Sequence, residues 1–307
     1  MRWRRDVPLS GLTRYRIGGP TPRFAVVEDR EALREALADL AGAPHRVVGG
    51  GANLLVADRG VEEAVLKLGG DFDYLRFREG GIEAGAAASL PALAGEARRR
   101  ALTGFVFLEA VPGTVGGGLR MNAGSREDWL WHRVVRAEAM TPEGEVEELA
   151  PEDAEPGYRR VGVPESWIFL GARFEGEAGD PDEVERAHLA FRSRKVEAQV
   201  YDRRSVGSIW KNPGEPHGSA WEVVDRVGMR GARRGGARVS EKHANFIVNA
   251  EDATAGDVLG LMAEIHRRAR ERLGVDLRPE IQLWGFREEE LRSVGAAGGQ
   301  TRAGEAR

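Results

Sequence analysis

The sequence contains no cysteine among its 307 residues. Disulfides, a thiolate nucleophile, iron–sulfur ligation and a cysteine-linked flavin are therefore excluded. The six histidines are scattered and include no pair at the spacing of metal ligands, so no metal site is predicted. A chain without disulfides fits a cytoplasmic protein, and that is the location we expect.

Long apolar runs and an excess of one charge are also absent. No apolar stretch approaches the roughly 20 residues that span a bilayer, and the segment from Met1 to Asp6 lacks the apolar region of a signal peptide. We therefore expect no membrane association. The 45 basic and 49 acidic residues give a net charge of −4, which offers no electrostatic case for binding nucleic acid. The length favours two domains, with three small ones possible.

The commoner nucleotide-binding signatures are missing, but two glycine-rich segments are present. Neither a P-loop nor a G-x-G-x-x-G motif at the start of a βαβ unit occurs. The two segments are Gly49–Leu55 (GGGANLL) and Pro112–Gly118 (PGTVGGG). Glycine permits positive φ and close backbone approach, and consecutive N–H groups can cradle anionic oxygens. Either segment alone could be an ordinary tight turn. Together they predict a site for an extended phosphate group, such as that of a dinucleotide.

Residue patterns divide the chain into three parts and a tail. Residues 1–69 form a small α/β part, residues 70–180 are richer in strands, residues 181–286 form a third part, and residues 287–307 read as a poorly ordered tail. Strands are expected at 24–27, 46–48, 64–68, 81–86, 134–140, 145–149, 167–174 and 245–248. Helices are expected at 31–40, from Ser89 to about Arg100, at 185–197, and from the Thr254 capping box to Gly274.

Three further segments carry candidate chemistry. They are Gly157-Tyr158-Arg159, Gly207-Ser208 with Lys211-Asn212-Pro213, and Pro279-Glu280. Each has a plain explanation when taken alone: a surface ion pair for Arg159, a turn at Ser208, and a solvated carboxylate at Glu280.

In the order and spacing of these segments, the chain resembles the UDP-N-acetylenolpyruvoylglucosamine reductase (MurB) family. The likeness runs from about Thr13 to Gly285. It includes the segment 13–19, both glycine segments with 121–124, the three segments above, and the segment 240–246. The chain departs from the family at Ala52, where serine is usual, at Val161, and at Gln199-Val200, where Gln-Pro is common. The short stretch from 174 to 181 matches the subtype that lacks the tyrosine-bearing lid insertion.

The resemblance implies an α+β fold with two FAD-binding subdomains of the vanillyl-alcohol-oxidase (PCMH) type and a C-terminal α+β substrate-binding domain. It implies non-covalent FAD, NADPH as reductant, and reduction of the enolpyruvyl ether of UDP-N-acetylglucosamine to UDP-N-acetylmuramate for peptidoglycan. The residues implied to bind FAD are Gly49, Gly50, Gly51, Ala52, Asn53, Leu54, Pro112, Gly113, Thr114, Gly116, Gly117, Asn122, Ala123 and Gly124.

The resemblance also assigns catalytic roles. Arg159 would stabilise negative charge that develops on the substrate carboxylate, because a guanidinium keeps its proton. Glu280 would be its carboxyl partner, with a raised pKa. Ser208 would donate a proton to the second carbon of the double bond. Tyr158, Lys211 and Asn212 would bind substrate.

Two other interpretations remain open at this stage. One is an FAD oxidase or dehydrogenase of the same fold that acts on a sugar or hydroxy acid. The segments around Ser208 and Glu280 argue against it, since such enzymes do not need that pairing. The other is a flavin- or nucleotide-binding protein without turnover. For the leading interpretation, a monomer is expected, with a small nucleotide-sugar molecule as its partner.

Overall fold

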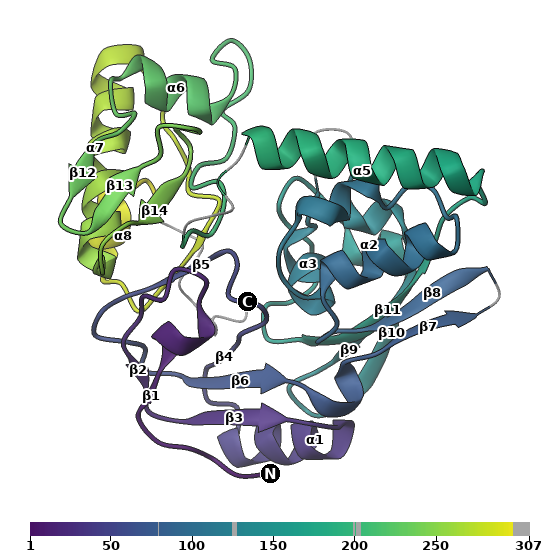
Figure 1. The fold of residues 1–307 in the computed structure, drawn as a ribbon. Helices are drawn as coiled ribbons and strands as arrows, with labels where there is room; N and C mark the ends of the chain where they lie inside the picture. The colour runs from purple at the N-terminus through teal and green to yellow at the C-terminus, as the bar shows by residue number, and fades with distance from the viewer. Residues whose placement is uncertain (79, 125–127, 199, 201–203, 297–307) are drawn as a thin grey trace.

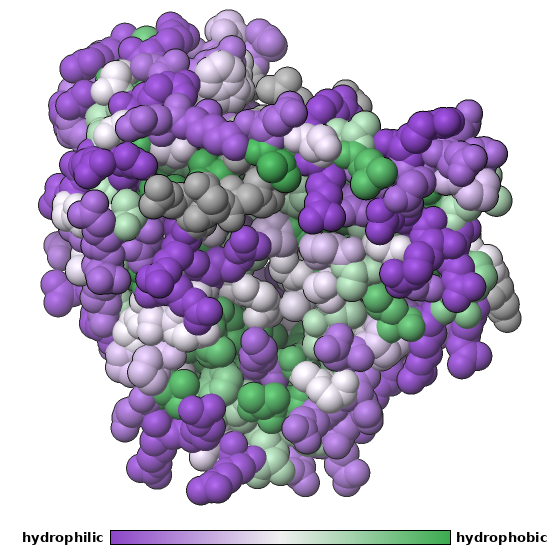
Figure 2. Space-filling model, viewed as in Figure 1, coloured by the Kyte–Doolittle hydropathy of each residue, from purple (hydrophilic) through white to green (hydrophobic). Residues whose placement is uncertain are grey.

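The structure, a computed structural model, describes residues 1–78, 80–124, 128–198, 200 and 204–296. These residues form a small parallel sheet with one helix, a larger antiparallel sheet covered by helices, and a third helical part with its own short sheet (Figure 1). On the face shown in Figure 2, hydrophilic residues cover the rim, and apolar or neutral residues gather in the middle.

The first part contains three parallel strands. β6 (Ala64–Leu68) lies between β3 (Phe24–Val27) and β4 (His45–Val47). α1 (Arg30–Leu40) begins at Asp29, whose side chain accepts a hydrogen bond from the Ala32 N–H. The apolar stripe of α1 packs on the sheet, as its periodicity predicts. The strands and the helix expected here are confirmed. Its short elements are β1 (Val7–Pro8), η1 (Leu9–Leu12), β2 (Pro20–Thr21) and η2 (Gly70–Phe72).

One strand of the first part pairs with a strand from the other end of the chain. β5 (Leu54–Val56), which follows the first glycine segment, pairs in parallel with β15 (Gln282–Trp284) from near the end of the chain. More than 220 residues separate the two strands (282 − 54 = 228), so local pattern could not predict the pair. The pairing brings the segment after Glu280 to the first glycine loop.

The second part is a five-stranded antiparallel sheet of order β10-β9-β11-β8-β7. Helices cover one of its faces (Figure 1). The expected hairpin is confirmed, as is the N-cap at Ser89, which accepts from the Ala92 N–H. The elements are β7 (Leu75–Arg78), β8 (Gly81–Gly85), α2 (Leu90–Arg99), η3 (Val106–Ala110), α3 (Val115–Met121), η4 (Leu130–His132), β9 (Val134–Met140), β10 (Val146–Leu149), α4 (Pro151–Ala154) and β11 (Ile168–Glu175).

α5 (Pro181–Ala198) was expected to open the third part. It packs instead on η3 and α2 of the second part. The buried His188 ring nitrogen Nδ1 lies 2.9 Å from the Glu109 carboxylate, which ties the helix to η3. The second packing unit therefore extends past the expected boundary at residue 180.

The third part has a large hydrophobic core of its own. α7 (Ala255–Leu273) begins with the predicted capping box at Thr254 and ends at Gly274, whose φ is +66°. Beside it lie α6 (Ala220–Arg226) and the antiparallel strands β12 (Arg233–Arg234), β13 (Ala237–Val239) and β14 (Ile247–Asn249).

The expectation of a poorly ordered tail from residue 287 is wrong for its first ten residues. Glu288–Ser293 form α8, and Leu291, Val294 and Ala296 are buried in the core of the third part. Three apolar side chains in a polar sequence were enough to hold a short helix on α7. Residues 297–307 lie outside the described residues.

Candidate active site

The first glycine loop presents a run of free backbone donors. Within the described residues, no protein acceptor receives a hydrogen bond from the N–H groups of Gly49 to Asn53. Gly51 has φ +57°, and its own carbonyl oxygen accepts from the Arg14 N–H at 3.0 Å. Five consecutive free donors at a bent, glycine-rich turn are the arrangement that binds anionic oxygens.

The two glycine segments lie against each other. A Cβ placed on Gly50 would sit 2.9 Å from the Cα of Gly113, so the backbones meet with no room for a side chain. Among the described residues, the N–H groups of Gly113 and Thr114 also lack a protein acceptor. The chain thus offers one cradle built from both loops, and this cradle fits the pyrophosphate of a dinucleotide such as FAD.

The second segment is only partly a loop, which corrects the sequence interpretation. Thr114 is the N-cap of α3, and the helix contains the glycines that follow it. The Gly116 N–H donates to the Ala86 carbonyl, and a Cβ on Gly116 would lie 3.0 Å from that of Ala86. Gly116 therefore permits close packing of α3 on the end of β8, and its N–H is not free for phosphate.

The side chain of Asn122, a residue implied to bind FAD, is hydrogen-bonded within the protein. Its side chain is buried, and Nδ2 donates to the Gly157 carbonyl at 3.0 Å while Oδ1 accepts from the Trp131 N–H at 3.3 Å. The neighbouring Ala123 carbonyl accepts from the Leu130 N–H. With its hydrogen-bonding groups used inside the protein, the Asn122 side chain supports the turn that carries Arg159.

Arg159 lies in that turn. The N–H and carbonyl groups of Gly157 and Arg160 bond to each other, and Arg159 between them has φ +56°. A left-handed conformation costs a residue with a side chain about 1–2 kcal/mol, so the surrounding contacts must hold it. Its Nε donates to Glu280 Oε1 at 2.7 Å, with both side chains largely buried.

The Ser208 and Glu280 segments, 72 residues apart (280 − 208), pair like strands. The Glu280 N–H donates to the Ile209 carbonyl at 2.8 Å, and the Lys211 N–H donates to the Arg278 carbonyl at 2.9 Å. The Glu280 carbonyl in turn accepts from Asn53 Nδ2 at 3.1 Å, in the first glycine loop. The catalytic trio predicted from sequence is therefore gathered beside the cradle: Arg159 through its ion pair, and Ser208 through its neighbour Ile209.

Burial raises the pKa of Glu280 above its ordinary value, against the opposing pull of Arg159 and then Lys211. The direction of this pKa shift is the one expected from the sequence. Burial likewise raises the pKa of Tyr158, with the charge of Glu280 adding to it.

Ser208 is half-buried, and its hydroxyl bonds to no side chain or backbone group in the described parts of the chain. It follows Gly207, whose φ is +84°. The implied substrate residues Tyr158 and Asn212 are joined, because the Asn212 N–H donates to Tyr158 Oη at 3.3 Å. A hydroxyl that has no partner among the described residues, next to a hydrogen-bonded backbone, can act toward a bound molecule.

Two residues next to the site, Trp129 and Asn245, were not identified as candidates from the sequence. The Arg159 guanidinium carbon lies 5.3 Å from the centre of the Trp129 ring, and Tyr158 packs edge-on against the same ring. Asn245 bonds to the backbone of Trp210, two residues past Ser208. No local signal marks Trp129, whereas Asn245 stands in the segment 240–246 that carried part of the family likeness.

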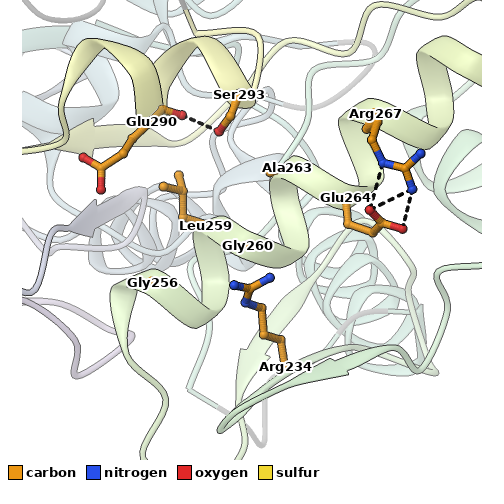
Figure 3. Close-up of a pocket in the computed structure, with 9 residues that line it drawn as sticks. All are labelled: Arg234, Gly256, Leu259, Gly260, Ala263, Glu264, Arg267, Glu290 and Ser293. Atoms are coloured by element: carbon orange, nitrogen blue, oxygen red, sulfur yellow. Dashed lines mark hydrogen bonds and ion pairs between the residues drawn. The ribbon is translucent and has the colours of Figure 1, made fainter.

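A hollow elsewhere on the surface does not belong to this site. It measures about 410 Å³ and lies between α7 and α8, lined among others by Arg234 and by Glu264 and Arg267, which form an ion pair with each other (Figure 3). None of its lining residues belongs to the glycine loops or the catalytic segments. In the described parts of the chain, no three His, Asp or Glu side chains are placed to hold a metal ion. No helix there combines the length and apolar character needed to cross a membrane.

Comparison with known proteins decides the family. A family model described as the UDP-N-acetylenolpyruvoylglucosamine reductase C-terminal domain matches residues 199–284, and an FAD-binding domain model matches residues 21–150. The reductase of Paramagnetospirillum magneticum is 41% identical over 92% of this chain and 92% of its own length. The chain belongs to the UDP-N-acetylenolpyruvoylglucosamine reductase family. The reductase of Cereibacter sphaeroides, 38% identical over 91% of the chain and 94% of its own length, agrees.

A solved member of this reductase family shows the same fold. The crystal structure of the reductase from Thermus caldophilus superposes with a TM-score of 0.81 at 36% identity, and the match covers 92% of this chain and 99% of that one. The expected FAD-binding fold with a C-terminal reductase domain is confirmed. Family membership also favours a peptidoglycan-synthesis flavoenzyme over the two interpretations that the sequence alone left open.

Proposed function

We propose that this chain reduces the enolpyruvyl ether of UDP-N-acetylglucosamine to UDP-N-acetylmuramate, with bound FAD and with NADPH as reductant. The observation that carries the proposal is the ion pair between Arg159 and Glu280, held next to the Ser208 segment and hydrogen-bonded to the first glycine loop. Family membership supports the same reaction.

The cofactor would be held by the cradle of the two loops. The free N–H groups of residues 49–53, together with those of Gly113 and Thr114, would bind the pyrophosphate oxygens of FAD. When bound and reduced by NADPH, FAD would supply the hydride that is added to the terminal carbon of the enolpyruvyl double bond.

The protein's own residues would provide the charge and the proton. Arg159 would stabilise the negative charge that moves toward the substrate carboxylate. Glu280, with its raised pKa, would donate a hydrogen bond to the same carboxylate when neutral. Ser208 would give its hydroxyl proton to the second carbon, which completes the addition of two hydrogens across the double bond. Tyr158, Lys211 and Asn212 would hold the rest of the substrate.

Spectroscopy of the purified protein tests this proposal. The bound flavin should bleach with NADPH, and its colour should return on anaerobic addition of the enolpyruvyl substrate. In Ser208→Ala, bleaching should be unchanged, and recovery should slow by about 10²–10⁴-fold, the usual contribution of general acid catalysis. A protein without flavin, or a flavin that the substrate does not reoxidise, would contradict the proposal. Normal recovery in Ser208→Ala would contradict the role of the hydroxyl.

We further propose that the protein is a cytoplasmic monomer that binds a nucleotide sugar and not nucleic acid. The proposed substrates, NADPH and a UDP-sugar, are cytoplasmic metabolites, and the net charge of −4 offers no electrostatic case for binding nucleic acid. Light scattering during size-exclusion chromatography should give the mass of one chain, 33.5 kDa. A mass of twice this value or more would contradict the monomer.

A further inference from the structure

We propose that Asn245 is a positioning residue for Ser208, acting by fixing the backbone that follows it. This role is separate from the binding of FAD or substrate, and it rests on the function proposed above.

Three hydrogen bonds join Asn245 to the two residues after Ser208. Its Oδ1 accepts from the Trp210 N–H and its Nδ2 donates to the Trp210 carbonyl, both at 2.9 Å. Its backbone carbonyl accepts from the Ile209 N–H, also at 2.9 Å. The side-chain amide thus takes the place of a peptide group in a neighbouring strand, since it has the same donor and acceptor.

On its other side, the same segment pairs with the residues from Arg278 to Glu280. The Ile209 carbonyl accepts from the Glu280 N–H, and the Lys211 N–H donates to the Arg278 carbonyl. Together with Asn245, this strand satisfies every backbone donor and acceptor from the Ile209 N–H to the Lys211 N–H. The Trp210 side chain is buried as well and stacks on His266. The backbone after Ser208 is therefore fixed from two sides.

Fewer hydrogen bonds fix the described backbone before Ser208. Among residues 204–207, the Arg204 carbonyl accepts from the Asn249 N–H, and Val206 is buried in the core. Gly207 then follows at a positive φ, and the Ser208 hydroxyl has no protein partner among the described residues. The place of the hydroxyl therefore depends chiefly on the anchor directly after it. Because a displacement of about 1 Å at a reacting group can cost about 10²-fold in rate, the Asn245 amide bears directly on proton delivery.

The loop that carries Asn245 is itself ordered. Ser240 Oγ accepts from the N–H groups of Lys242 and His243, and the Phe246 N–H donates to the His243 carbonyl. Asn245 is 4% exposed. Because the loop around Asn245 is fixed by these bonds, its side-chain amide can fix the backbone of Trp210.

Asn245→Asp tests the inference, since it keeps the volume and the acceptor but removes the donor to the Trp210 carbonyl. Asn249→Asp is the matched control: Asn249 is also buried, and its side-chain amide bonds to the Tyr15 carbonyl and the Ala253 N–H and not to the residues after Ser208. Its backbone bond to the Arg204 carbonyl is unchanged by the substitution. We expect Asn245→Asp to bleach normally with NADPH but to reoxidise about 10²-fold more slowly than the control. The solvent deuterium isotope effect on reoxidation should increase, because proton delivery becomes the slow step.

Lower pH should partly rescue Asn245→Asp relative to Asn249→Asp, since a protonated aspartic acid regains a donor. Asn245→Ser, which keeps a small donor and acceptor, provides a second variant if the first does not fold. Reoxidation at the rate of the control, or equal slowing of both half-reactions, would overturn the inference. Failure of both Asn245 variants to fold, with Asn249→Asp folded, would overturn it in favour of a purely structural role. Failure of the proposed function itself would already be visible in the unsubstituted protein.

Discussion

Removing the Leu291 side chain should destabilise the third part of the protein. Leu291 is 3% exposed and lies in the core around α7, together with Val294 and Ala296. Truncation of a buried leucine to alanine costs about 2–5 kcal/mol. Because α8 has only six residues and lies near the surface, the site can partly collapse, so we expect about 2–3 kcal/mol for Leu291→Ala.

The assay is thermal and urea denaturation followed by tryptophan fluorescence. In a chain of this size, each kcal/mol lowers Tm by about 2–4 °C, so Leu291→Ala should melt several degrees below the unsubstituted protein. Arg292→Ala is the control in the same helix, since its side chain is 64% exposed and pairs only with the exposed Glu288. Loss of such a pair changes stability by about 0–1 kcal/mol.

The reasoning would be refuted if the Tm values of Leu291→Ala, Arg292→Ala and the unsubstituted protein were the same. It would mean that α8 does not contribute to the core and that the whole segment from residue 287 behaves as a tail. Flavin reoxidation should be measured on the same samples, because Arg278 connects the end of α8 to the site. Its Nη1 donates to the Gly295 carbonyl, just past α8, and its own carbonyl accepts from the Lys211 N–H.

Further predictions concern the cradle and the buried carboxyl group. Gly50→Val should lose flavin, because its Cβ would lie 2.9 Å from the Gly113 Cα and force the two loops apart; Gly95→Ala, with only ordinary contacts, should keep full flavin absorbance. Gly116→Val should also lose flavin, because pushing α3 away from Ala86 would shift Thr114 at the start of the helix. Full flavin occupancy in both valine variants would contradict the cradle. Burial raises the pKa of Glu280 in the folded protein above the ordinary 4.5. The stability of the protein relative to Glu280→Gln should therefore be greatest below pH 4.5 and should fall as the pH rises through the folded-state pKa. Urea midpoints of the two proteins that differ by the same amount at every pH would exclude this shift.

Local pattern was sufficient for the elements whose stability is local. The stripe on α1, the N-cap at Ser89, the capping box at Thr254 and the hairpin of β9 and β10 each follow from neighbouring residues. The candidate site residues were proposed from motifs shared with a family, and their roles stay predictions. Sequence periodicity alone did not indicate that Arg159, Ser208 and Glu280 meet.

The sequence did not predict α3, the β5–β15 pair or α8, because contacts with distant residues outweigh the local secondary-structure preference there. Three consecutive glycines disfavour a helix, yet α3 forms because a chain without Cβ atoms packs closely on Ala86, Leu90 and Leu130. The pairing of β5 with β15 depends on strands from opposite ends of the chain. α8 looked like a tail because its sequence is mostly charged, and only its contact with α7 shows what its few apolar residues do.

Glu280 connects the parts of the proposed chemistry through both its backbone and its side chain. The carbonyl accepts from Asn53 in the cradle, the N–H donates to Ile209 beside Ser208, and the carboxylate accepts from Arg159. Replacing the side chain leaves the two backbone bonds in place. Glu280→Gln therefore keeps the cradle and the Ser208 strand aligned, and any loss of reoxidation in that variant reports on the carboxyl group itself. Displacement of the strand, as expected for Asn245→Asp, would instead impair proton delivery while Glu280 stays intact.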